Sequence, residues 1–154
     1  MREALVGLGG NHAMRTQPGI RRNMASIVRI ATRTGQTELG RELADEWLAS
    51  VSGTTRPYIA ALVAATRAAL AESDGDFELA ARLAGSAVEP LAAYLAFPEH
   101  GRALLLLGKA RGALGDPSAG EALVLARDVF AGLGMKPARA EAEALLEGEV
   151  SAEA

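Results

Sequence analysis

Three glycines at equal distances along the chain, Gly35, Gly75 and Gly115, constrain the fold more than any other feature. Consecutive members are 40 residues apart, and each lies between two stretches whose apolar residues have helical spacing. Glycine ends helices well because it adopts a left-handed backbone at little cost. Equivalent turns at a fixed interval are the signature of a repeat array. The spacing therefore predicts a tandem array of helix pairs with a 40-residue unit.

Apolar residues three and four apart predict three helix pairs and a last, single helix. The six paired helices are expected at residues 20–34, 36–51, 56–73, 76–96, 98–114 and 116–133. A capping helix should begin at Pro137. Pro90 lies inside the fourth helix, where it removes one backbone hydrogen bond, so a bend is expected there. Asp116 followed by Pro117 predicts the start of the sixth helix, with Asp as its N-cap.

The chain is expected to divide into three segments. Residues 1–19 are poorly defined, because glycines interrupt their only apolar run. Residues 20–147 form the helical repeat domain. Residues 148–154 are acidic and polar and are expected to be a disordered tail.

Composition excludes several function classes. The net charge is −3, which removes the global basic excess typical of nucleic-acid binders. The chain has no cysteine, so it has no disulfide, thiolate metal site or thiol nucleophile. No apolar run reaches the roughly 18–20 residues of a membrane span. We expect a soluble, cytoplasmic protein that binds neither membranes nor, directly, nucleic acid.

No motif for catalysis, a cofactor or a metal is found. Gly108-Lys109 lacks the earlier glycine and the following Ser or Thr of a phosphate-binding loop. His12 and His100 are far apart in the chain and lack a zinc-ligand spacing. We therefore expect no enzyme activity, no cofactor and no metal.

Acidic and aromatic residues have structural interpretations. Asp74, Asp76 and Glu78 do not match a calcium loop, and helix capping and solubility explain them better. Trp47 and Tyr94 lie on apolar helical stripes, where core packing is favoured over ligand stacking.

Two segments resemble tetratricopeptide repeats. They are residues 74–81, which begin Asp-Gly-Asp, and Leu106-Leu107-Gly108-Lys109-Ala110, which is followed by Leu114-Gly115-Asp116. The last third resembles the C-terminal helical arrays of bacterial adenylate cyclase-like ATPases and LuxR/MalT-like transcriptional regulators. The resemblance implies an all-α, right-handed superhelix of antiparallel helix hairpins, with three pairs and a C-terminal capping helix. Because the usual unit is about 34 residues, units of this length imply longer helices.

Charge divides between the first and second helices of the pairs. The first helices contain nine basic and two acidic residues, and the second contain ten acidic and three basic residues. In arrays that this chain resembles, the first helices line the concave surface, which repeat proteins use for binding. The resemblance thus implies a basic groove. The charge division also fits a bland alternative, in which acids complement helix dipoles and arginines form a solvated face.

The candidate partner-binding residues are the cations of this groove: Arg22, Arg29, Arg33, Arg67, Arg102 and Lys109. The leading hypothesis is a non-catalytic protein–protein interaction module of a bacterial signalling or regulatory protein. Its groove would bind an acidic peptide from a protein partner or from a missing domain of the same polypeptide. The alternative is a sensor of an anionic metabolite in a transcriptional regulator. Self-association into a homo-oligomer is also open.

Overall fold

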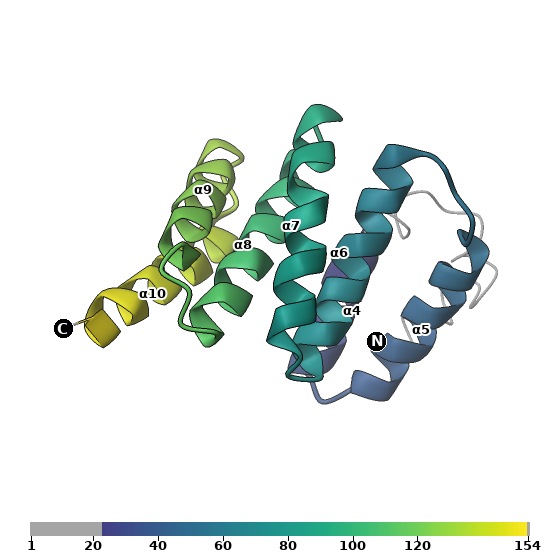
Figure 1. Ribbon diagram of the computed structural model, residues 1–154, viewed down its shortest axis with the longest axis horizontal. Helices are drawn as coiled ribbons and strands as arrows, with labels where there is room; N and C mark the ends of the chain where they lie inside the picture. Colours follow the sequence, from purple (N-terminus) through teal and green to yellow (C-terminus); the bar gives the residue numbers. More distant parts are fainter. Residues whose placement is uncertain (1–22, 154) are drawn as a thin grey trace.

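The computed structural model describes residues 23–153, so the expected N-terminal segment 1–19, Arg22 and His12 lie outside it. These residues form seven helices and no strand, which confirms the all-α class (Figure 1). The helices are α4 (Met24–Arg33), α5 (Thr37–Ser50), α6 (Pro57–Ser73), α7 (Phe77–Ala93), α8 (Phe97–Ala113), α9 (Ala119–Gly132) and α10 (Lys136–Glu153).

Each helix packs mainly against its neighbours in the chain. The closest partners are α6 with α7, α7 with α8, and α8 with α9, and α9 also packs against α10. The exception is α5, which packs on α4 but hardly contacts α6; α4 instead joins this first pair to α6. The array in Figure 1 consequently runs from α5 at one end to α10 at the other.

The turns follow one hydrogen-bond pattern. Gly35, Gly75 and Gly115 all have a left-handed backbone, with φ of 73°, 79° and 69°. After α6, the Gly75 amide donates to the Glu72 carbonyl (3.1 Å) and the next amide donates to Ala71 (2.9 Å). These two bonds satisfy carbonyls that the helix end leaves without partners. The predicted glycine turns are confirmed.

Leu95 occupies the corresponding position between α7 and α8, although it is not glycine. Its φ is 55°, and the same pair of bonds forms, from Leu95 to Ala92 and from Ala96 to Leu91, both 3.0 Å. Helices α6, α7 and α8 each have 17 residues. Left-handed turn residues therefore recur every 20 residues, at 75, 95 and 115.

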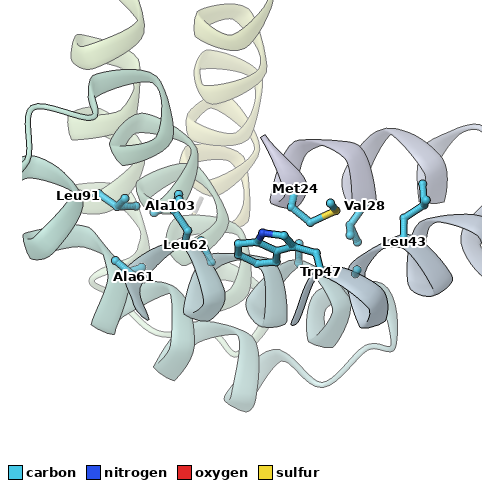
Figure 2. Close-up of a cluster of buried hydrophobic side chains, with 12 residues drawn as sticks. Met24, Val28, Leu43, Trp47, Ala61, Leu62, Leu91 and Ala103 are labelled. Atoms are coloured by element: carbon cyan, nitrogen blue, oxygen red, sulfur yellow. The ribbon is translucent and has the colours of Figure 1, made fainter. Parts of the chain in front are cut away.

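The core is built largely from alanine and leucine, and Trp47 is its largest side chain. Trp47 is 2% exposed and packs with Met24, Val28 and Leu43 from α4 and α5 and with Leu62 from α6 (Figure 2). The prediction that Trp47 belongs to the core is confirmed. Tyr94 is 55% exposed and stacks obliquely on Tyr58 at a centroid distance of 5.6 Å, so its predicted place in the core was wrong.

The start of α9 and the end of α10 differ from those expected. Helix α9 begins at Ala119, not after Asp116, because the Asp116 carboxylate accepts bonds from the Ser118 amide (2.9 Å) and hydroxyl (2.6 Å). These bonds form a turn and hold the pKa of Asp116 below its usual range. Helix α10 continues to Glu153, through the residues expected to be a disordered tail. Glu149 lies beside Gly112 and Gly120, so this segment is docked against α8 and α9.

The proline in α7 does not divide the helix. Pro90 lies near its C-terminal end, and α7 runs without interruption from Phe77 to Ala93. A proline interrupts only the bond that its own nitrogen would donate, so the neighbouring turns remain intact.

Candidate functional site

Four of the six candidate cations line one open cavity of about 850 Å³. The cavity, here called the cation groove, lies between α4, α8 and α10. Its lining residues are Arg29, Arg33, Arg102, Lys109, Met135, Pro137, Ala138, Glu141, Ala144 and Leu145. The four cations of this cavity are up to 80 residues apart in the sequence.

The two remaining candidates are Arg67 and Arg22. Arg67 is exposed on α6 and lines neither this cavity nor a smaller cavity between α4, α6 and α8. Arg22 lies outside the described residues. Within α4, Ser26 is 8% exposed and Arg29 is partly buried, whereas Arg33 is exposed.

A smaller cavity lies behind the cation groove, between α4, α6 and α8. Its volume of about 40 Å³ has room for roughly three water molecules. Alanine and leucine make up half of its lining residues, while Arg29, Arg102 and Lys109 also line the larger cavity. This space is too small for a metabolite, whereas the cation groove is large enough for one.

Glu141 of α10 joins the two arginines of α4 across the groove. Its Oε2 atom lies 3.0 Å from Nη1 of Arg29 and 3.4 Å from Nη1 of Arg33. The side chain of Glu141 is 20% exposed, and that of Arg29 25%, whereas Arg33 is 64% exposed. Partial burial of the Arg29 pair reduces screening by water and makes it the stronger of the two. Sequence reasoning missed Glu141, because nothing near it in the sequence indicates that α10 reaches α4.

The other cations also have carboxylates beside them. Lys109 Nζ lies 2.9 Å from Glu72 Oε1, and Glu99, which is 8% exposed, attracts Arg102. Four cations and three carboxylates therefore line the two cavities. The cation groove itself is lined by these four cations and one carboxylate, Glu141, while Glu72 and Glu99 line the smaller cavity.

Arg102 is the most constrained of these cations. Its Nη1 donates to Asn23 Oδ1 at 3.3 Å, but its buried Nε has no acceptor among the described residues. Desolvation lowers the pKa of Arg102, the neighbouring Arg29 lowers it further, and Glu99 acts in the opposite direction. An anionic group entering the groove would find an unused donor here.

The remaining candidates for chemistry have structural contacts. Asp76 caps α7 by accepting a bond from the Leu79 amide at 3.1 Å, and Asp74 pairs with Arg41. His100 is partly buried, and its Nδ1 lies 2.9 Å from the Val88 carbonyl oxygen. Within residues 23–153, no cluster of three or more His, Asp or Glu residues could hold a metal ion.

Comparison with known proteins finds no matching family model, no matching curated protein and no matching solved structure. Among the helices described, none has the length and apolar character needed to cross a membrane.

Proposed function

We propose that the chain is a tetratricopeptide-like array, a right-handed superhelix of hairpins whose first helices line the concave side. Left-handed turn residues every 20 positions and three successive 17-residue helices support a repeated unit. Helices α4, α6 and α8 together line the inner cavity. These are the first helices of the three pairs.

The proposed function is a non-catalytic protein–protein interaction module of a bacterial signalling or regulatory protein. Its cation groove binds an acidic segment, from a protein partner or from another domain of the same polypeptide. The observation that carries this proposal is the position of Glu141. A carboxylate on a helix sits between Arg29 and Arg33, at the place where an acidic partner would bind.

Charge reversal at one exposed cation tests this function. A fluorescein-labelled oligoglutamate peptide serves as the acidic probe, oligolysine is the charge control, and fluorescence anisotropy measures affinity. Arg33→Glu should weaken oligoglutamate binding about tenfold, because it places like charges together in the groove. Arg67→Glu is the matched control, since Arg67 is also exposed on a helix but lies outside the groove. Equal losses in both variants, or no binding of the probe to either the wild type or a Glu141→Gln chain, would overturn the proposal.

A second candidate function, sensing an anionic metabolite, is favoured by Arg102. Its buried Nε lacks an acceptor and the residue lines the cation groove, whose volume suits a small ligand. A thermal-shift screen of anionic metabolites separates the two functions. A saturable rise in Tm with one compound, lost in Arg102→Gln, supports sensing, whereas indifference to every compound favours protein binding.

A further inference from the structure

Helix α10 is held weakly for its length. Between Lys136 and Ser151, Ala142 is its only buried side chain. Its apolar residues Ala138, Leu145 and Leu146 are partly buried and pack against a cluster around Leu123 and Phe130. In contrast, α8 buries eight residues, Glu99, Gly101, Ala103, Leu104, Leu105, Leu107, Gly108 and Ala110. A helix with so little buried surface can detach at low free-energy cost.

Open space lies on two sides of α10. The cation groove lies between it and α4, and a second open cavity of about 470 Å³ lies between it and α8, where Glu149 reaches across to Gly112. Its main packing partner is α9, and it makes few contacts with α8. The ion pairs of Glu141 with Arg29 and Arg33 therefore hold α10 to α4 across the groove.

With α10 in place, Glu141 already pairs with two of the four cations of the open groove. Because Glu141 occupies both arginines of α4, a second carboxylate cannot bind them fully until Glu141 leaves. The helix also shows what chemistry the groove accepts. It presents a carboxylate one turn away from Ala138 and Leu145, a small and a leucine side chain that also line the groove.

We propose that α10 is a displaceable latch, which occupies the acid-binding groove through Glu141 until an acidic partner helix replaces it. The partner is an amphipathic helix of the same chemistry as α10, with a small-residue and leucine face beside a carboxylate. This inference rests on the proposed function of the cation groove and adds to it the class of partner and a control over access.

Hydrogen exchange of the full chain without any partner tests the latch. Glu141→Gln keeps the size of the side chain but removes its charge, so α10 amides should exchange about fivefold faster, the effect of losing one or two partly exposed ion pairs. Glu143→Gln is the matched control. Glu143 lies on the same helix and pairs with Arg139, also on α10, at 2.7 Å. Unchanged α10 protection in Glu141→Gln, or equal acceleration in both variants, would overturn the latch.

Binding of a latch peptide in trans tests the partner class. A labelled peptide of residues 136–153 should bind the Glu141→Gln chain about fivefold more tightly than the wild type, whose own α10 competes with it. The same peptide carrying Glu141→Gln should bind both chains more weakly. Equal affinity of the two peptides would refute the requirement for a carboxylate.

Failure of the latch and failure of the groove give different results. If Arg33→Glu weakens oligoglutamate binding but Glu141→Gln leaves the hydrogen-exchange protection of α10 unchanged, the groove proposal stands and the latch falls. If oligoglutamate binds neither the wild type nor the Glu141→Gln chain, the groove proposal falls, and the latch falls with it.

Discussion

Leu95 shows how much one residue can depart from the pattern around it. It adopts a left-handed backbone at a turn position where Gly75 and Gly115 stand one helix earlier and later. A side chain with a Cβ atom in this conformation costs about 1–2 kcal/mol. The Leu95 side chain is 70% exposed, so little packing offsets that cost.

Leu95→Gly should therefore stabilise the fold, by about 0.5–1 kcal/mol after the larger unfolded-state entropy of glycine is subtracted. Leu114→Gly is the matched control, because Leu114 is 46% exposed at a helix end but has a φ of −87°. It should destabilise the fold. Urea denaturation followed by circular dichroism measures both, and a loss of stability in Leu95→Gly would contradict the strain argument.

The residue scale also shows where sequence reasoning ends. Gly35, Gly75 and Gly115 could be predicted, because glycine is the residue that a left-handed turn favours. Leu95 could not, because leucine carries no such signal. Asp116 was misread for a related reason. An Asp before a proline can cap a helix or form a local turn, and its bonds with Ser118 decide for the turn.

At the scale of helices, close approach depends on particular glycines. A Cβ atom at Gly108 would lie 2.6 Å from both Cγ and Cδ2 of Leu123 and 3.3 Å from the Ala119 carbonyl oxygen. Leu123 is 1% exposed and has little space in which to move. This glycine therefore sets the distance between α8 and α9.

Gly108→Ala should destabilise the protein by about 1–3 kcal/mol, the usual cost of overpacking a core. Gly148→Ala makes the same change inside α10, where a Cβ atom meets nothing within 4 Å. It should be neutral or stabilise by up to about 1 kcal/mol, because alanine is the better helix former. Thermal unfolding compares the two, and effects of the same sign would refute the packing role of Gly108.

Helix positions were predictable where turn residues and apolar spacing agreed. Helices α6 and α8 lie within one residue of their expected ranges at both ends. The C-terminus of α10 was not predictable from composition. Its acidic residues are typical of a tail, but the contact of Glu149 with α8 and α9 depends on tertiary packing.

Across the whole molecule, protection from hydrogen exchange should fall from the middle of the array toward both ends. Among the described helices, α6, α7 and α8 have close neighbours on two sides, whereas α5 packs mainly on α4 and α10 buries one side chain. In a repeat array, each helix draws its stability from its neighbours. Exchange measured by mass spectrometry should be fastest in α5 and α10. Uniform protection along the chain would rule out this gradient.

The candidate site was predictable in part at this scale. The alternation of charge between first and second helices identified four cations that share one cavity. It could not identify Glu141, because the approach of α10 to α4 depends on how the helices between them pack. In an array, that arrangement is the sum of small rotations between successive units and leaves no local trace in the sequence.

The ion pairs between α4 and α10 depend on how many helices lie between them. Arg29 and Glu141 meet only because a fixed number of helices separates them. Neighbouring helices pack about 8–10 Å apart, so one more 40-residue unit would carry the two side chains far beyond contact. A change in the number of units between α4 and α10, for example by duplication of coding sequence, would therefore separate Glu141 from Arg29 and Arg33.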